Sequence, residues 1–278
     1  MTATGVRIAL CQITSTADPA HNLSIMERWV RRAADSGARV VLFPEATMAH
    51  FGISLAEVAQ PLDGPWARAV AQLAAEHNVL IVAGMFTPAG ARVRNTVLLT
   101  GLGYHLGYNK IHLYDAFGYR ESATVAPGTD CVTVTVDGLV LGVTTCYDVR
   151  FPALFQRLAD KGASAILLPT SWGAGEGKAQ QWDLLVRARA LDSGSWVLGC
   201  DQADPGSTGV PVNPNAPTGI GRSLVVDPFG RVQGRLDTEP GLLVAEVDAA
   251  TPIRARAATG VLANSAALDR EQYRHLGS

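Results

Sequence analysis

Three short stretches of the chain place ionisable or nucleophilic side chains next to apolar residues. They centre on Glu45, on Lys110 and on Cys146. In α/β folds, the strand ends and the loops that follow them are where binding and catalytic groups are placed. A carboxylate, an ammonium group and a thiol that meet at one point can serve as base, electrostatic stabiliser and nucleophile. These stretches therefore hold the candidate chemistry of the chain.

Each of these residues also has a plain structural explanation. Cys146 could be an ordinary core cysteine, although it ends a predicted strand and opens a helix, where the helix dipole and free N–H groups would lower the thiol pKa. Glu45 and Lys110 could form a buried structural ion pair, and Glu121, taken alone, could be a solvated loop residue. The remaining cysteines fall inside predicted strands and are interpreted as core residues: Cys11, Cys131 and Cys200.

The hydrophobic pattern predicts the elements that position these residues. Continuously apolar runs predict buried strands, over residues 6–13, 39–43, 79–86, 94–99, 131–136, 139–145, 165–169, 195–200, 223–226 and 243–247. Apolar residues at helical spacing predict helices, over residues 22–36, 66–74, 151–159 and 178–191. In the last of these helices, one face carries Leu184, Leu185, Ala188 and Leu191. The dipeptide Asp137-Gly138 is typical of a tight hairpin, because type I′ turns need positive φ.

Helices spaced between strands indicate an α/β fold, and the number of strands suggests two partly antiparallel sheets. No linker divides the chain, so we expect one domain over residues 1–250. The polar C-terminal tail, residues 251–278, has no evident partner within the chain and is expected to pack on a neighbouring surface. The segment 204–217, rich in Gly, Pro and Asn, is predicted to be a loop. It could be a plain surface loop, a lid or an oligomer contact.

Composition excludes several classes of protein. The 278 residues are 47% hydrophobic and 17% charged with a net charge of −2, so we expect a well-buried core and no binding to nucleic acid. No apolar run reaches the ~18 residues of a membrane-spanning helix, and the first twenty residues or so do not resemble a signal peptide. The 4 cysteines and 6 histidines show no paired ligand spacing. Reduced thiols in the cytoplasm and no metal site are therefore expected.

Together the three stretches resemble those of the nitrilase superfamily of carbon–nitrogen hydrolases, whose triad is Glu-Lys-Cys. The acid motif matches at 43–46 (Phe-Pro-Glu-Ala), the lysine motif at 110–115 (Lys-Ile-His-Leu-Tyr-Asp) and the nucleophile motif at 146–152 (Cys-Tyr-Asp-Val-Arg-Phe-Pro). The resemblance continues through 187–192 and 221–230, in the family's order. It implies a four-layer α-β-β-α sandwich with two mixed β-sheets. It also implies a homodimer or larger oligomer formed through helices, often with the C-terminal tail reaching the partner.

The resemblance further implies a role for each residue. Cys146 would be the nucleophile that forms a thioester, and Glu45 the base that takes the thiol proton and later activates water. Lys110 and the backbone N–H of Tyr147 would stabilise the oxyanion, while Glu121 would hold Lys110 or the substrate amide. The substrate pocket would include Tyr114, Tyr147, Arg150 and Trp172. No metal or organic cofactor is needed for this chemistry.

Within the superfamily, the chain is most similar to the Nit branch of ω-amidases and deaminated-glutathione amidases. Tyr147 and Asp148 follow the cysteine where nitrilases proper usually have Trp, so an amide is expected rather than a nitrile. The stretch 171–182 departs from the family's Thr-Gly…His-Trp pattern, with Gln181 in place of His. The connection 115–121 is also short. Both regions lie near the pocket in this family, so these departures affect which substrate is bound and leave the catalytic triad intact.

Arg150 lies four residues after Cys146, where it could hold a carboxylate of the substrate. It could instead form an ion pair with Asp148 or another acid that only shapes the turn. We expect an amidase that converts a small ω-amide of a carboxylic or keto acid, such as α-ketoglutaramate or deaminated glutathione, to an acid and ammonia. Two alternatives stay open. The same triad could serve an acyltransferase or a carbamoyl-amine hydrolase, or the chain could be an inactive scaffold, against which the intact Glu45, Lys110 and Cys146 argue.

Overall fold

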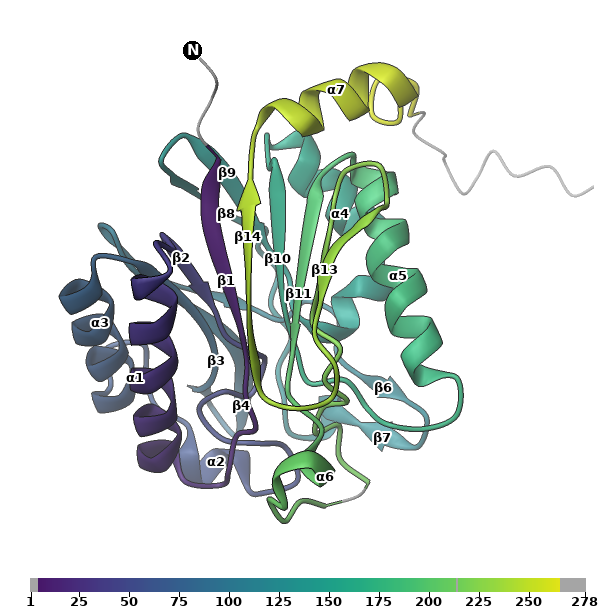
Figure 1. The fold of residues 1–278 in the computed structure, drawn as a ribbon. Helices are drawn as coiled ribbons and strands as arrows, with labels where there is room; N and C mark the ends of the chain where they lie inside the picture. The colour runs from purple at the N-terminus through teal and green to yellow at the C-terminus, as the bar shows by residue number, and fades with distance from the viewer. Residues whose placement is uncertain (1–4, 214, 266–278) are drawn as a thin grey trace, which may run out of the picture.

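The computed structural model describes residues 5–213 and 215–265. Within these residues, two six-stranded sheets lie face to face, in the strand orders β14-β1-β2-β3-β4-β5 and β13-β12-β11-β10-β9-β8 (Figure 1). The first sheet comprises β1 (Val6–Gln12), β2 (Val40–Leu42), β3 (Leu80–Ala89), β4 (Arg92–Gly101), β5 (Tyr104–Asn109) and β14 (Gly241–Val247). The second comprises β8 (Val132–Val136), β9 (Leu139–Val143), β10 (Ala165–Thr170), β11 (Trp196–Asp201), β12 (Leu224–Val226) and β13 (Val232–Arg235).

Both sheets are mixed, with a parallel centre and antiparallel edges. Strands β1, β2 and β3 are parallel neighbours, as are β9, β10 and β11. The outer pairs of each sheet are antiparallel. The hairpin predicted from its dipeptide connects β8 to β9, and Asp137 and Gly138 both have positive φ, at 47° and 82°. Parallel strands with helical connections explain why the central strands are apolar on both faces.

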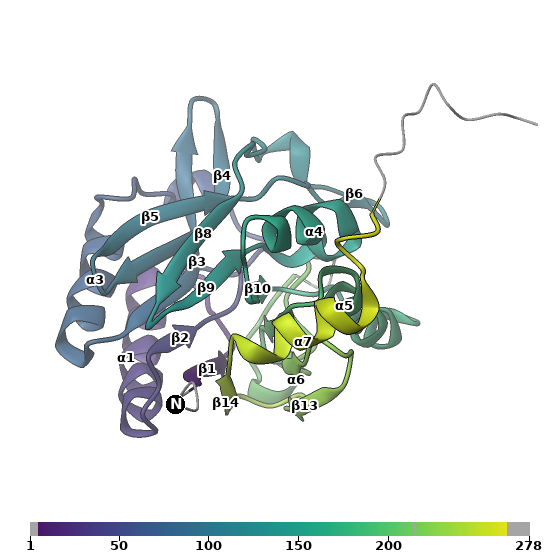
Figure 2. The same cartoon turned by 90° about the horizontal axis from the view of Figure 1, so that it is seen from above.

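Helices cover the outer face of each sheet. Figures 1 and 2 show α1 (Pro19–Asp35) and α3 (Pro65–His77) on the first sheet, and α4 (Pro152–Asp160) and α5 (Lys178–Ser193) on the second. The layers therefore follow the expected α-β-β-α order. Shorter helical segments lie in the connections and near the C-terminus: α2 (Leu55–Val58), η1 (Glu121–Ala123), η2 (Cys146–Arg150), α6 (Pro205–Thr208) and α7 (Ala250–Thr259). A two-stranded hairpin, β6 (Asp115–Ala116) with β7 (Tyr119–Arg120), also lies outside the main sheets.

Local sequence explains the outer helices. In α1 the side chain of Asp18 caps the N-terminus by accepting from the Ala20 N–H, and Pro19 occupies the first turn, where its missing N–H is not needed. Met26, Val30 and Ala33, at spacings of four and three, are buried against the sheet. These residues lie within the helix that the sequence predicted over residues 22–36.

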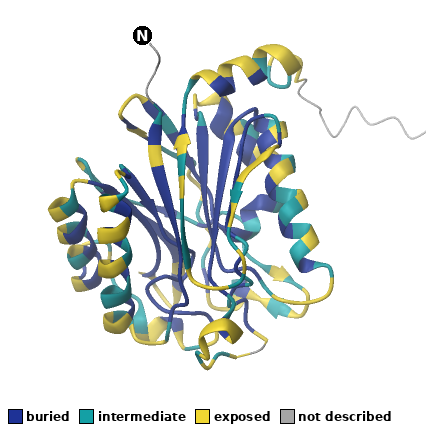
Figure 3. Cartoon of the chain, in the orientation of Figure 1, coloured by how far each residue is buried: buried dark blue, intermediate teal, exposed yellow. Residues whose placement is uncertain are grey.

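The largest apolar cluster lies between the two sheets, as the dark blue strands in Figure 3 show. Leu10 and Leu42 of the first sheet and Leu141, Leu167 and Leu198 of the second are all fully buried there. Burying each such side chain contributes roughly 1.5–3 kcal/mol to folding. A core of this kind fixes the spacing of the two sheets, and therefore the separation of the side chains at their ends.

The structure differs from the sequence prediction in α5. Leu184 and Leu191 are 67% and 47% exposed, whereas Trp182, Val186 and Ala190 are buried. The leucine face is therefore split: Leu184 and Leu191 point to solvent, whereas Leu185 packs against the core of the second sheet. The buried face of the helix also contains polar residues. The strands that the sequence did not predict are short or partly exposed: β5, β6, β7 and β13.

The C-terminal segment also differs from expectation. The start of the expected tail forms α7, in which Arg256 donates hydrogen bonds to the carbonyl oxygens of Ala163 and Ser193 and to Oγ of Ser195. The prediction that the tail lacks a partner within the chain is wrong for this part. The contacts of Arg256 are hydrogen bonds to backbone and hydroxyl oxygens, and a search for apolar patterns in the sequence does not detect such contacts. Residues 266–278 lie outside the described residues, so contact of the tail with a partner subunit stays a prediction.

Candidate active site

The nucleophile candidate lies on a tight turn after β9. Cys146 opens the short helix η2 with a φ of +46°, a left-handed conformation that is uncommon for non-glycine residues. A reciprocal capping box holds the turn, because the Asp148 carboxylate accepts from the Thr145 N–H at 2.9 Å and the Thr145 side chain accepts in return. The turn places the Cys146 Sγ 3.7 Å from the carbonyl oxygen of Ser171, which follows β10.

Asp148 also ties this turn to the lysine segment. Its buried carboxylate accepts from Tyr108 Oη at 2.6 Å and from the His112 N–H at 3.1 Å, and lies 2.7 Å from His112 Nδ1. The His112 ring stacks on Phe151 at 3.7 Å. The alternative in which Arg150 pairs with Asp148 is wrong, since that carboxylate is fully used in this way. Arg150 instead donates to Gln181 Oε1 at 2.7 Å.

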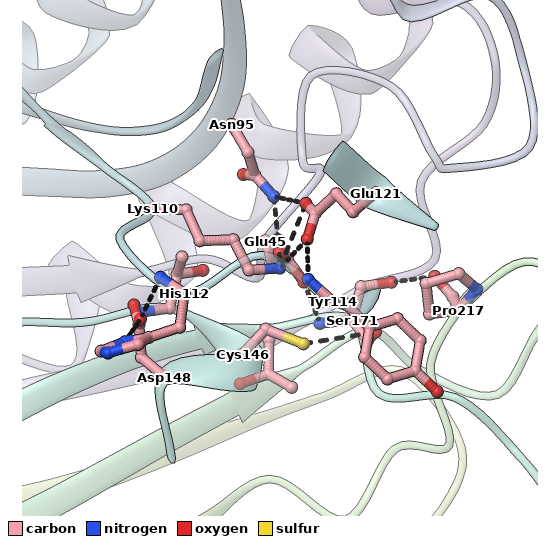
Figure 4. Close-up of polar contacts among 12 residues, drawn as sticks. Glu45, Asn95, Lys110, His112, Tyr114, Glu121, Cys146, Asp148, Ser171 and Pro217 are labelled. Atoms are coloured by element: carbon pink, nitrogen blue, oxygen red, sulfur yellow. Dashed lines mark hydrogen bonds and ion pairs between the residues drawn. The ribbon is translucent and has the colours of Figure 1, made fainter. Parts of the chain in front are cut away.

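Three charged side chains meet above the thiol in a buried cluster. Lys110 Nζ lies 2.9 Å from Glu45 Oε1 and 2.9 Å from Glu121 Oε2, and Figure 4 shows both carboxylates converging on it. Glu45 follows β2, Lys110 follows β5, and Glu121 opens η1. Glu121 is only 2% exposed, so the solvated-loop interpretation of this residue is wrong. The structure thus brings the four predicted catalytic residues into one cluster.

The backbone of Glu45 is held from two directions. Its carbonyl oxygen accepts from Gln202 Nε2 at 2.9 Å. On the other side it lies against Gly84 of β3, where an added Cβ would be 2.7 Å from the Glu45 Cα. Only glycine permits this close approach. The position of the carboxylate therefore depends on the packing of two sheets as well as on its own loop.

Sequence reasoning missed two groups that orient the carboxylates. Asn95 Nδ2, within β4, donates to Glu45 Oε1 at 2.7 Å and to Glu121 Oε1 at 3.0 Å. The Ser171 N–H donates to Glu45 Oε2 at 3.0 Å. The signal for Asn95 was an amide shortly before the apolar run 97–99 of the same strand. A backbone donor such as Ser171 leaves no signal in the sequence.

The electrostatics of the cluster correct the expectation for the thiol. Burial raises the pKa of Cys146 well above its ordinary value, the Glu45 carboxylate raises it further, and Lys110 acts in the opposite direction. The helix-dipole argument predicted a lowered pKa and is wrong, because desolvation outweighs the dipole of one short turn. At neutral pH the resting side chain is therefore a thiol that needs a base.

The pKa shift of Glu45 suits a base, and that of Lys110 suits a permanent cation. Burial raises the pKa of Glu45; Lys110 lowers it and Glu121 raises it, and the net direction is upward. Burial acts to lower the pKa of Lys110, but the carboxylates of Glu121 and Glu45 outweigh it and raise that pKa well above its ordinary value. Lys110 therefore stays an ammonium group, while Glu45 can exchange a proton nearer to neutral pH.

A narrow pocket opens onto the thiol. All four predicted substrate-binding residues line it, together with groups that were not predicted, among them Lys178. The lining residues are Tyr114, Cys146, Tyr147, Arg150, Ser171, Trp172, Gly173, Lys178 and Pro217. Trp172 is fixed by a hydrogen bond from its N–H to Asp201 Oδ1 at 2.8 Å and from its indole to the Lys178 carbonyl oxygen at 3.0 Å.

Within residues 5–213 and 215–265, no group of three or more His, Cys, Asp and Glu side chains is arranged to hold a metal ion. In the same part of the chain, no helix is both long and apolar enough to cross a membrane. The fold and the buried Glu-Lys-Cys cluster define the class of protein: an α-β-β-α sandwich with a thiol facing a small pocket.

Comparison with known proteins identifies the family. Residues 7–257 match the carbon-nitrogen hydrolase family. A Mycobacterium tuberculosis protein named only as a hydrolase is 51% identical over 266 residues, covering 93% of this chain and 95% of that protein. Human deaminated glutathione amidase is 32% identical over 257 residues, covering 87% and 76%. The structure of a variant amidase from Nesterenkonia sp. AN1, with acrylamide added at its active site cysteine, has a TM-score of 0.75 at 27% identity, covering 92% and 98%.

The chain belongs to the carbon-nitrogen hydrolase family. It is an enzyme that acts on carbon–nitrogen bonds other than peptide bonds. The family resemblance and the sandwich fold expected from the sequence are thereby confirmed.

Proposed function

We propose that this enzyme cleaves a small ω-amide of a carboxylic or keto acid to the acid and ammonia, through a thioester on Cys146. The observation that carries the proposal is the buried cluster of Glu45, Lys110 and Cys146 beneath a small pocket that also contains Arg150. The nucleophile and a cation for the substrate's acid end line this pocket, and the base and the oxyanion stabiliser are buried next to the nucleophile.

The reaction follows from the protonation states. Glu45 takes the proton of the Cys146 thiol as the sulfur attacks the amide carbon, and the oxyanion forms beside the Lys110 ammonium and the Tyr147 N–H. Each such donor is worth roughly 3–4 kcal/mol of transition-state stabilisation. The proton then passes from Glu45 to the leaving nitrogen, which departs as ammonia and leaves a thioester. Glu45 next activates a water molecule, which releases the acid and restores the thiol. Glu121 acts by holding Lys110 in place.

The surroundings of Arg150 support recognition of an acid. Its guanidinium faces aromatic rings rather than carboxylates, with its carbon 5.2 Å from the Trp172 ring centre and 5.8 Å from that of Tyr147. Its Nε is buried and has no hydrogen-bond partner within the described residues. A substrate carboxylate would give this guanidinium the charged partner that it lacks. The name of the human relative, deaminated glutathione amidase, supports an acid-bearing amide as well.

The proposal is tested with a pair of amides of equal length, one ending in a carboxylate and one neutral. Arg150→Gln should raise KM for the acid amide by about 10- to 100-fold, because a charge-assisted hydrogen bond is worth about 1.5–3 kcal/mol. KM for the neutral amide should change little. Arg157→Gln, on the exposed side of α4, is the matched control and should leave both values unchanged. Equal losses for the two amides in Arg150→Gln, or a wild-type preference for the neutral one, would contradict acid recognition.

We also propose that the protein forms a homodimer through the outer face of α5. The support is the exposure of Leu184 and Leu191 on that helix and of Ile253, 67% exposed, on α7. Leu184→Glu should convert a dimer into a monomer at micromolar concentration, measured by light scattering, because it places a charge in an apolar contact. Arg28→Glu on α1, in the opposite outer layer (Figure 1), should leave the dimer intact. A monomeric wild type would rule out this interface.

A further inference from the structure

Lys178 is a second cation in the pocket, and the proposed mechanism does not use it. It is the first residue of α5, is only 8% exposed, and lines the same space as Cys146. Its Nζ lies 3.4 Å from Tyr114 Oη and 3.3 Å from the centre of the Phe117 ring. The side chain is thus held among aromatic groups at the mouth of the active site.

The position of Lys178 is locally unfavourable. A lysine in the first turn of a helix faces the positive end of the helix dipole, and α5 has no acidic residue in that turn. Burial lowers the pKa of Lys178, and the charge of Arg150 lowers it further. Local conflicts of this kind mark functional positions more often than structural ones. Lys178 also falls in the stretch 171–182, where the sequence departs from the family's pattern.

No carboxylate compensates the two cations. The residues that line the pocket include Arg150 and Lys178 but no acid, and neither cation is in an ion pair within the described residues. The acids on neighbouring elements are engaged elsewhere. Asp115 accepts from the Ser122 N–H, Glu121 binds Lys110, and Asp183 binds Arg235. Glu176 is exposed on the loop before α5.

The two cations suit different parts of one ligand. The flat fork of Arg150 matches the two oxygens of a carboxylate, whereas the ammonium group of Lys178 is a point charge that can donate to a single oxygen. A ligand that engages both cations presents a carboxylate to Arg150 and a further oxygen acceptor to Lys178. An ammonium group at that place would meet a like charge in a confined, poorly solvated space.

We propose that Lys178 is a specificity-determining residue, which with Arg150 selects an ω-amide whose acid end carries a second oxygen beside the carboxylate and rejects one with an ammonium group there. This inference rests on the proposed function, since it assigns the acid end of the substrate to the same pocket. It predicts that a keto or hydroxy acid amide is accepted and the corresponding amino acid amide is not.

The test compares three five-carbon ω-amides that differ only at the carbon next to the carboxylate: a keto group, an amino group, or two hydrogens. Wild type should favour the keto compound over the amino compound. Lys178→Met keeps the apolar stem and removes the charge. The ratio of kcat/KM for the keto compound to that for the amino compound should fall by about tenfold or more. The variant loses both the attraction of Lys178 for the keto oxygen and its repulsion of the substrate's ammonium group. The unsubstituted compound should change by less than about threefold.

Two further variants complete the experiment. Lys178→Arg should retain most of the selectivity, and Lys161→Met, an exposed lysine after α4, should match wild type. If Lys178→Met lowers turnover of all three amides equally, the lysine only supports the pocket wall and the inference is wrong while the proposed function stands. If wild type hydrolyses none of the three, the proposed function fails and the inference with it.

Discussion

Cys146→Ala is expected to abolish amide hydrolysis, with kcat reduced by about 10⁴-fold or more, as losses of a covalent nucleophile generally are. The substitution removes one sulfur from a turn that its capping box holds independently, through Thr145 and Asp148. The variant should therefore remain folded, with a circular dichroism spectrum like that of wild type. The assay is ammonia release from the acid amide under saturating conditions.

Two other cysteines provide matched controls. Cys131 is partly buried outside the cluster, and Cys200 is fully buried in the core. Replacing either with Ala should retain activity, although Cys200→Ala should lose stability because it leaves a small cavity. Mass spectrometry after brief treatment with iodoacetamide should place the adduct on Cys146. Comparable loss of activity in folded Cys131→Ala would remove Cys146 from the nucleophile role.

The raised pKa of Cys146 adds a kinetic signature to this experiment. Because the resting group is a thiol, alkylation depends on a base as well as on access. Glu45 is the carboxylate that raises the thiol pKa, and it is the base proposed for removing the proton. Glu45→Gln removes the base and also a charge that raises the thiol pKa. Ammonia release should therefore be lost, while the pH at which Cys146 becomes alkylated should shift downward.

The sequence predicted the parts of this protein that depend on pattern and motif. Apolar runs located the central strands, and the residues after two of them supplied Glu45 and Cys146. Lys110 follows β5, which the apolar pattern did not predict. It failed where a role depends on contacts between distant segments. Asn95 appeared to be one more strand residue, and its amide bridges Glu45 and Glu121 only because β4 lies beside both loops.

The burial of helix faces was also difficult to predict from the sequence alone. The leucine stripe of α5 satisfied the periodicity of a core-facing helix, yet Trp182 and Val186 fill the space over the second sheet. Periodicity records that a face is apolar and not which surface covers it. The predicted direction of the Cys146 pKa shift was wrong for a related reason. The sequence showed that the residue opens a helix, but it did not show how deeply the thiol is buried.

Lys110→Met should produce the second large effect, on both catalysis and stability. Removing the ammonium group eliminates an oxyanion donor, so kcat should fall by about 10²- to 10³-fold. It also leaves Glu45 and Glu121 buried together without a cation. Breaking a buried ion pair in this way costs about 3–5 kcal/mol of unfolding free energy. Urea titration at pH 8 measures the stability, and ammonia release measures the activity.

A second-site change separates the two effects. In Lys110→Met/Glu121→Gln, one of the two buried carboxylates becomes neutral, so the free energy of unfolding should recover by at least about 1 kcal/mol. Activity should not recover, because the double variant still lacks the ammonium group beside Cys146. Recovery of activity together with stability would show that Lys110 serves only to balance charge.

The pH dependence of Lys110→Met follows from the same charges. Burial and Glu121 raise the pKa of Glu45, and Lys110 is the group that lowers it. Without Lys110, the folded protein should hold its carboxyl protons to a higher pH than the unfolded chain, whose glutamates titrate near ~4.3. Where the folded state binds more protons, stability falls as the pH rises. The stability deficit of Lys110→Met relative to wild type should therefore be smaller at pH 5 than at pH 8. A deficit that grows on acidification would mean that the two carboxylates are not electrostatically coupled through Lys110.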